Sequence, residues 1–116
     1  MKRVLIVEDS GFQRKTIRKV LAELGYETLE AENGQLGLEA VDREHPDIII
    51  TDIAMPEMNG EEMVQELKSR ECHIPIIVLS SDIQGSTKEM FVQLGAKDFL
   101  SKPIDKDQIA STLAKL

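Results

Sequence analysis

The sequence predicts an α/β fold of the (βα)5 type, a doubly wound parallel sheet of five strands with helices on both faces. Apolar runs typical of buried strands alternate along the chain with segments whose apolar residues recur at helical spacing. The continuously apolar runs at 4–7, 48–50 and 76–79 indicate central strands, whereas the mixed runs at 27–31 and 98–101 indicate edge strands. The strand order 2-1-3-4-5 satisfies this pattern. Right-handed crossovers then place the first and last helices on one face of the sheet.

Each of the five helices is predicted from apolar residues that share one buried face. In chain order these residues are Ile17, Val20, Leu21 and Leu24; Leu38 and Val41; Met63, Val64 and Leu67; Met90, Phe91 and Leu94; and Ile109, Leu113 and Leu116. Gly25 and Gly95 are expected to end the first and fourth helices, and Asp105 to cap the fifth. Ser86 with Glu89 predicts a capping box at the start of the fourth helix.

The composition indicates a single soluble domain over residues 1–116. A net charge of −7 argues against sequence-independent nucleic-acid binding, which needs a basic surface. Cys72 is the only cysteine, so no intramolecular disulfide can form and a reducing compartment is indicated. The chain starts with a strand too short for a signal peptide core or a membrane span. We therefore expect a cytoplasmic protein that contacts neither nucleic acid nor membrane.

Acidic residues follow two of the predicted central strands. Glu8 and Asp9 come directly after the first strand, and Asp52 ends the strand that contains three consecutive isoleucines. In the order 2-1-3-4-5 the switch point lies between strands one and three, so these three carboxylates should meet in one crevice. They repel one another unless a cation neutralises them, and oxygen ligands of this kind suit Mg²⁺. The sequence therefore predicts a magnesium site.

Strands four and five should bring a hydroxyl, Ser80, and an ammonium, Lys102, to the rim of the same crevice. A carboxylate nucleophile, a divalent cation, an ammonium and a hydroxyl donor are the parts needed for phosphoryl transfer. Asp52 is the best candidate nucleophile because it lies between the other acids and the Ser80–Lys102 pair. Taken singly, each residue has a simpler interpretation, such as Asp9 capping the first helix. A metal site without phosphorylation remains the alternative for the group.

Five motifs resemble, in their order and over essentially the whole chain, the receiver domains of bacterial two-component response regulators. They are Val7-Glu8-Asp9-Ser10; Asp52-Ile53-Ala54-Met55-Pro56 followed by Asn59-Gly60; Leu79-Ser80-Ser81; Gly95-Ala96; and Lys102-Pro103. The resemblance implies that Asp52 accepts a phosphoryl group from the phosphohistidine of a sensor histidine kinase or histidine phosphotransfer protein. It also implies that Glu8, Asp9, Asp52 and the backbone carbonyl of Ala54 bind Mg²⁺.

The same resemblance assigns a switch hydroxyl to Ser80, a switch aromatic to Phe99 and a phosphoryl contact to Lys102. It implies a cis Lys102–Pro103 bond and an output protein bound through helix four, strand five and helix five. The chain departs from the receiver family at two positions: Glu8 stands where Asp is commoner, and Phe99 stands where Tyr is frequent. Two variable positions, Ala54 and Asp82, are expected to tune the lifetime of the phosphoryl group.

Two other functions fit the predicted architecture less well. A phosphatase of the haloacid dehalogenase type needs an acid two residues after its nucleophile, where this chain has Ala54. A flavodoxin-type electron carrier needs a phosphate-binding loop after the first strand, where this chain has acids. We expect a stand-alone receiver, with a receiver excised from a larger regulator or hybrid kinase as the alternative. Such a domain is not an enzyme, since it catalyses only its own phosphorylation and dephosphorylation.

Overall fold

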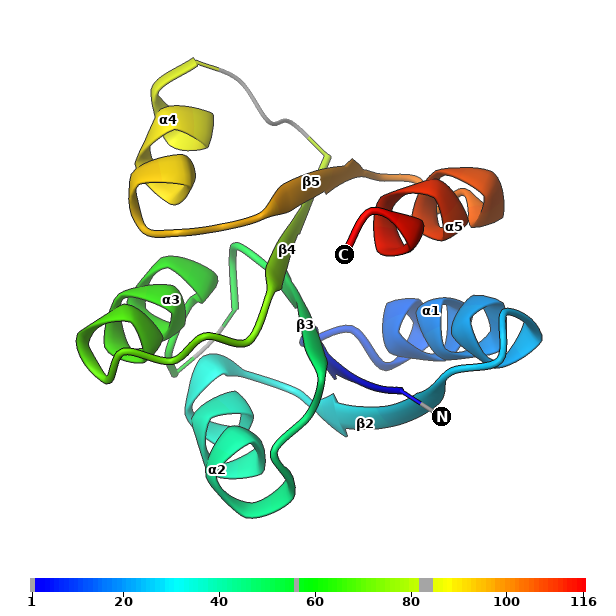
Figure 1. Cartoon of the computed structure of the whole chain (residues 1–116), viewed down its shortest axis with the longest axis horizontal. Coiled ribbons are helices and arrows are strands. Elements are labelled where there is room, and N and C mark those ends of the chain that lie inside the picture. Colours follow the sequence, from blue (N-terminus) through cyan, green and yellow to red (C-terminus); the bar gives the residue numbers. More distant parts are fainter. Residues whose placement is uncertain (1, 56, 82–84) are drawn as a thin grey trace.

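The computed structural model describes residues 2–55, 57–81 and 85–116. Its strands are β1 (Arg3–Val7), β2 (Glu27–Ala31), β3 (Ile48–Asp52), β4 (Ile76–Ser80) and β5 (Asp98–Ser101). Its helices are α1 (Gly11–Glu23), α2 (Gly34–Glu44), α3 (Gly60–Ser69), α4 (Gly85–Gln93) and α5 (Lys106–Ala114). The strands form one parallel sheet in the order β2-β1-β3-β4-β5 (Figure 1). The predicted fold class and strand order are confirmed.

Helices cover both faces of the sheet and divide the core into two halves. Helices α1 and α5 lie on one face, as predicted, and α2, α3 and α4 lie on the other (Figure 1). The side chains of each strand alternate between the two halves because successive residues of a strand point to opposite faces. In β3, Ile49 packs with α2 and α3, whereas Ile48 and Ile50 pack with α1 and α5. A strand buried on both faces therefore needs the continuous apolar run that the sequence shows.

Most helix ends follow the local sequence. Ser10, Asn33, Asn59 and Asp105 cap α1, α2, α3 and α5, each through a side-chain oxygen that accepts a backbone N–H of the first turn. Gly25 has a φ of +90° just after α1, a conformation that glycine adopts without steric cost. The C-terminal signal predicted there is therefore confirmed.

Two expectations about the helices are wrong. Helix α4 begins at Gly85, so Ser86 lies inside the helix and does not form its N-cap with Glu89. Helix α5 ends at Ala114, and Leu116 beyond it is 36% exposed instead of buried. The fourth helix thus begins earlier than its residue pattern predicts, and the fifth helix ends earlier than its residue pattern predicts.

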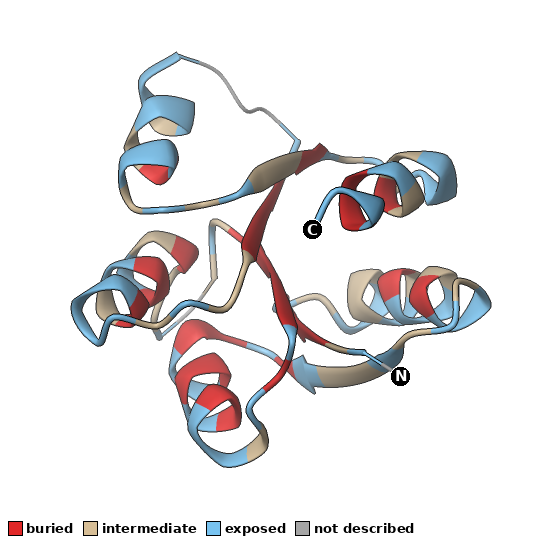
Figure 2. Cartoon of the chain, in the orientation of Figure 1, coloured by how far each residue is buried: buried red, intermediate tan, exposed pale blue. Residues whose placement is uncertain are grey.

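Helix α4 is the least buried helix of the described chain. Figure 2 shows buried residues along the inner faces of α1, α2, α3 and α5, whereas α4 carries a single one, Phe91. Val92 on the same helix is 54% exposed. Elements with few buried apolar contacts have low local stability and are the ones that move most easily.

The strand register places the carboxyl ends of the central strands side by side. Val7 of β1 pairs with Thr51 of β3, and Asp52 pairs with Leu79 of β4. The residues that follow β1 therefore emerge beside Asp52, at the switch point between β1 and β3. Within the described ranges, no helix is both long and apolar enough to cross a membrane.

Candidate functional site

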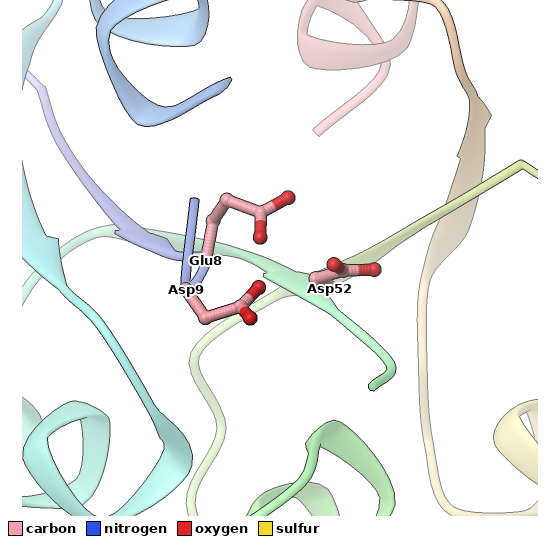
Figure 3. A group of neighbouring side chains, drawn as sticks. All are labelled: Glu8, Asp9 and Asp52. Carbon is pink, nitrogen blue, oxygen red and sulfur yellow. The ribbon is translucent and has the colours of Figure 1, made fainter. Parts of the chain in front are cut away.

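Three carboxylates converge where β1 and β3 end. One oxygen from each of Glu8, Asp9 and Asp52 lies within 4.8 Å of the other two, and the three side chains surround one space (Figure 3). Glu8 is almost fully buried, with 1% of its surface exposed, whereas Asp9 is exposed to solvent. The predicted convergence of these three acids is confirmed. Their spacing is compatible with a single hard cation that the carboxylate oxygens share.

Lys102 neutralises part of this acidic cluster. Its ammonium donates hydrogen bonds to Glu8 Oε1 and to Asp52 Oδ2, both at 3.1 Å. The backbone N–H of Lys102 donates to the carbonyl of Ser80 at 2.9 Å, which fixes the segment after β5 beside β4. The Lys102–Pro103 peptide is cis, as the resemblance implied. Lys102 thus lies at the centre of the site and not only at its rim.

The cluster shifts the acidity of two of its members. Burial raises the pKa of Glu8 to about 7, helped by a hydrogen bond with Asp9 and by the charge of Asp52. The Ser10 N–H and the Lys102 ammonium oppose this shift. Burial alone would lower the pKa of Lys102, but the hydrogen bonds and charges of Glu8 and Asp52 outweigh it and the pKa is raised. Without a metal, Lys102 therefore stays charged while Glu8 retains its proton up to near neutral pH.

Asp52 is held rigidly at the end of β3. Its Oδ1 accepts the N–H of Ile53 at 2.8 Å, and its carbonyl accepts the buried hydroxyl of Thr51 at 2.9 Å. The loop after it then returns to α3, where the N–H of Gly60 donates to the carbonyl of Ile53 at 2.7 Å. A Cβ at Gly60 would lie only 2.2 Å from the carbonyl oxygen of Asp52, so the close approach requires glycine.

The remaining predicted residues lie around this centre. Ser80 ends β4 and pairs in register with Ser101 of β5, beside the strand that carries Asp52. Phe99 of β5 is half-buried, and the ammonium of Lys88 from α4 lies 5.5 Å from the centre of its ring. Ala54 is exposed in the loop after β3. Asp82 lies outside the described residues.

The structure excludes the simpler interpretation of Asp9. Ser10, not Asp9, caps α1, because its hydroxyl oxygen accepts the N–H of Gln13 at 3.2 Å. Ser10 also has a role that the sequence analysis missed, since its backbone N–H donates to Glu8 Oε2 at 3.1 Å. Serine is a favoured N-cap residue, so the sequence carried a signal for the cap at Ser10 that the sequence analysis assigned to Asp9 instead. No sequence pattern indicates that the N–H of Ser10 also binds the carboxylate of Glu8. Asp9 is therefore free of a capping role and faces the acidic cluster.

Comparisons with known proteins agree with this geometry. The family model of the response regulator receiver domain matches residues 4–114. The chemotaxis protein CheY of Bacillus subtilis is 38% identical over 114 residues, which cover 97% of this chain and 95% of that protein. Among solved structures, the chemotaxis protein CheY4 of Vibrio cholerae matches with a TM-score of 0.93 and 30% identity, over 99% of this chain and 98% of that chain.

The chain therefore belongs to the receiver domain family of response regulators, and it is CheY-like. Its class is that of a signalling domain in two-component systems. A further structure, the receiver domain of a sensor histidine kinase of Pseudomonas aeruginosa, has a magnesium ion coordinated in its active-site cleft. It matches with a TM-score of 0.89 and 26% identity, over 98% of this chain and 95% of that chain. The cluster of Glu8, Asp9 and Asp52 is compatible with Mg²⁺ binding of this kind.

Proposed function

We propose that the protein is a phosphorylation-activated receiver in which Asp52 accepts a phosphoryl group, with Mg²⁺, from the phosphohistidine of a sensor histidine kinase or histidine phosphotransfer protein. The observation that carries the proposal is the contact of Lys102 with both Asp52 and Glu8. A lysine aimed at a carboxylate within an acidic cluster supplies the positive charge that a transferring phosphoryl group needs. The family membership supports the same conclusion.

In the proposed reaction a carboxylate oxygen of Asp52 attacks the phosphorus atom of the donor. An oxygen–phosphorus bond forms as the phosphorus–nitrogen bond of the phosphohistidine breaks, and the imidazole leaves with its electron pair. The hydrogen bond from the Ile53 N–H to Oδ1 limits rotation of the carboxylate. Such orientation reduces the entropic part of the barrier because the nucleophile does not have to be positioned anew. Lys102 remains protonated and can then contact the oxygens of the transferred group.

Glu8, Asp9, Asp52 and the carbonyl of Ala54 are the proposed metal ligands. The donor set consists of oxygens alone, and one of the three carboxylates is exposed, which suits an ion that retains several waters. Bound Mg²⁺ would supply charge neutralisation for the phosphoryl oxygens. Glu8 reaches the site from a buried position, with one oxygen on the Ser10 N–H and the other on Lys102. We propose that these contacts place Glu8 for direct or water-mediated metal binding.

Ser80 and Phe99 are proposed as the switch that reports phosphorylation to a partner. A phosphoryl group on Asp52 offers the Ser80 hydroxyl a charged acceptor, which makes a stronger bond than a neutral one. Movement of Ser80 towards Asp52 would leave space that the half-buried ring of Phe99 can fill. The surface of α4, β5 and α5 would change with it, and we propose that an output protein binds there. The low burial of α4 supports this choice of surface.

The wider setting of the protein is proposed on the same basis. Residues 1–116 form one receiver domain, which acts in the cytoplasm by binding partners and catalyses only its own phosphorylation and dephosphorylation. A receiver that is part of a larger regulator or hybrid kinase is the alternative, and it would use the same site. Neither arrangement requires contact with nucleic acid or with a membrane.

A small phosphodonor tests the proposed function without knowledge of the kinase. Incubation with acetyl phosphate and Mg²⁺ should add one phosphoryl group that hydroxylamine removes, as it removes acyl phosphates. Chelation of the metal should suppress the reaction. A protein that binds Mg²⁺ but gains no hydroxylamine-labile phosphoryl group would support the alternative of a metal site without phosphorylation.

A further inference from the structure

We propose that Arg14 is a positioning residue of the metal site, which fixes the peptide group that joins Glu8 to Asp9. Arg14 lies in the first half of α1, outside every motif that indicated the function. Its guanidinium contacts the backbone behind the acidic cluster and hydrogen-bonds none of the three carboxylates of that cluster. The inference rests on the proposed function, because it concerns how this chain orients the ligands of the same site.

Arg14 contacts the backbone of Glu8 directly. Arg14 Nη1 donates to the carbonyl oxygen of Glu8 at 2.5 Å, while the N–H of Glu8 donates to the carbonyl of Ala31 in β2 at 3.0 Å. Both backbone polar groups of Glu8 are therefore bound. Its carbonyl belongs to the planar peptide unit that continues into Asp9, so holding that carbonyl fixes the direction in which Asp9 leaves the strand.

Arg14 is itself held in place by Glu30. Its Nε donates to Glu30 Oε1 at 3.2 Å, and Glu30 Oε2 accepts from Arg18 Nη1 at 2.8 Å. A guanidinium suits this task because its planar fork can donate to two acceptors at once. Glu30 belongs to the edge strand β2 and pairs in register with Ile6 of β1. Arg14 thus ties the start of the acidic cluster to the edge of the sheet.

The contact between Arg14 and Glu8 should increase the affinity of the site for a metal ion. Groups that orient metal ligands without touching the ion typically contribute about 10- to 100-fold to metal affinity. Loss of the Arg14 contact would leave the Glu8–Asp9 peptide free to rotate. The carboxylates would then be oriented for metal binding in a smaller fraction of the conformations of the protein. The side chain of Arg14 is 19% exposed and borders a surface cavity of about 300 Å³. Its truncation therefore enlarges a solvent-filled space and does not open a void in the core.

Arg18 provides a matched control. It lies on the same helix, carries the same charge and binds the same Glu30, but it makes no contact with Glu8. The Mg²⁺ dissociation constant, measured by calorimetry, should rise about tenfold in Arg14→Ala. It should change by less than about twofold in Arg18→Ala, because a distant charge on an exposed side chain is largely screened. Arg14→Lys, which can still donate to the Glu8 carbonyl, should recover most of the lost affinity.

Two further readouts separate positioning from a general loss of stability. The phosphorylation rate of Arg14→Ala with acetyl phosphate should approach that of wild type at saturating Mg²⁺, since the defect lies in metal binding. In metal-free protein, the backbone amide signal of Asp9 should shift in Arg14→Ala and stay in place in Arg18→Ala. The second readout does not depend on phosphorylation, so it tests the role of Arg14 even if the proposed function fails.

Equal Mg²⁺ affinities in Arg14→Ala and Arg18→Ala, with an unchanged Asp9 amide signal in both, would overturn the proposal. A loss of affinity in Arg14→Ala that Arg14→Lys does not recover, despite a recovered free energy of unfolding, would also overturn it. Wild-type protein that binds no Mg²⁺ and gains no phosphoryl group would instead overturn the proposed function.

Discussion

The ammonium of Lys102 lies 3.1 Å from Asp52 Oδ2, although 50 residues separate the two along the chain. The same ammonium also binds the buried carboxylate of Glu8, so it is shared between two acids. This arrangement gives the metal-free protein an internal counter-ion for charges that would otherwise repel. A cation bound among the carboxylates would take over part of that task and release Lys102 towards a phosphoryl group.

Replacement of Lys102 should therefore destabilise the metal-free protein. Lys102→Met leaves Glu8 and Asp52 without their shared partner, and we expect the free energy of unfolding to fall by about 1–3 kcal/mol at neutral pH. Urea denaturation with a chelator present measures this loss, and saturating Mg²⁺ should reduce it. Lys97→Met, which removes an exposed charge near the start of β5, serves as the control. Equal stability losses in the two variants would contradict a shared counter-ion role.

The stability of the metal-free protein should depend on the proton of Glu8. Burial, the Asp9 hydrogen bond and the Asp52 charge raise the pKa of Glu8 from its ordinary value of 4.5 to about 7. Between pH 4.5 and about pH 7 the folded protein retains a proton on Glu8 that the unfolded chain releases. The free energy of unfolding therefore falls as the pH rises through this range. The stabilisation is complete below about pH 4.5 and is lost as the pH rises through about 7.

The size of this effect should be on the order of 3 kcal/mol, because one pKa unit corresponds to about 1.4 kcal/mol. Denaturation over the range from acid to neutral pH, compared between wild type and Glu8→Gln, isolates the contribution of Glu8. The variant cannot release the proton, so its stability should fall less as the pH rises. Parallel curves for the two proteins would show that the pKa of Glu8 is not raised.

Gly60 should tolerate no side chain. A Cβ at this position would lie 2.2 Å from the carbonyl oxygen of Asp52 and 3.1 Å from the Cα of Ile53, and backbone atoms cannot yield cheaply. We expect Gly60→Ala to destabilise the protein by about 1–3 kcal/mol and to slow phosphorylation by displacing Asp52. Gly11→Ala is a matched control, because Gly11 also begins a helix but a Cβ there would meet only the flexible end of the Arg14 side chain, at 3.6 Å. Unfolding curves that are alike for both variants would contradict this account.

The coupling of Ser80 to Phe99 should be visible by NMR. Full burial of an aromatic ring is worth on the order of 1.5–3 kcal/mol, enough to shift a two-state equilibrium tenfold or more. We expect a phosphoryl mimic such as beryllofluoride with Mg²⁺ to change the ring signals of Phe99 in wild type but not in Ser80→Ala. Ser81→Ala, which removes the neighbouring exposed hydroxyl, should respond as wild type does. Ring signals that respond equally in Ser80→Ala would show that the two residues are not coupled.

The sheet and the position of its acids could be predicted from the sequence because one pattern determines both. A continuous apolar run identifies a central strand, and in a parallel sheet the residue after each strand lies at the same edge. The convergence of Glu8, Asp9 and Asp52 follows from that rule and from the strand order. The ends of helices were less predictable. Ser86 and Glu89 match a capping box, yet α4 begins at Gly85, one residue before Ser86. A cap contributes only about 1 kcal/mol, so its residue pattern alone does not determine where a helix begins.

The contacts made by long side chains could not be predicted. Lys102 was expected at the rim of the crevice, but its reach to Glu8 depends on how the segment after β5 turns across the sheet. Arg14 carries no sequence signal at all, since its two acceptors lie on β2 and just after β1. The contacts of Arg14 depend on the direction in which its side chain leaves the packed helix. Residue spacing alone does not give that direction.

The central claim is that Asp52 is the phosphoacceptor, and mass spectrometry of a matched pair of variants tests it most directly. Asp47 lies just before β3 and Asp52 ends it, so Asp47→Asn and Asp52→Asn make the same chemical change at opposite ends of one strand. After incubation with acetyl phosphate and Mg²⁺, wild type and Asp47→Asn should each carry one hydroxylamine-labile phosphoryl group, and Asp52→Asn should carry none. Phosphorylation of folded Asp52→Asn at the wild-type rate would contradict the account.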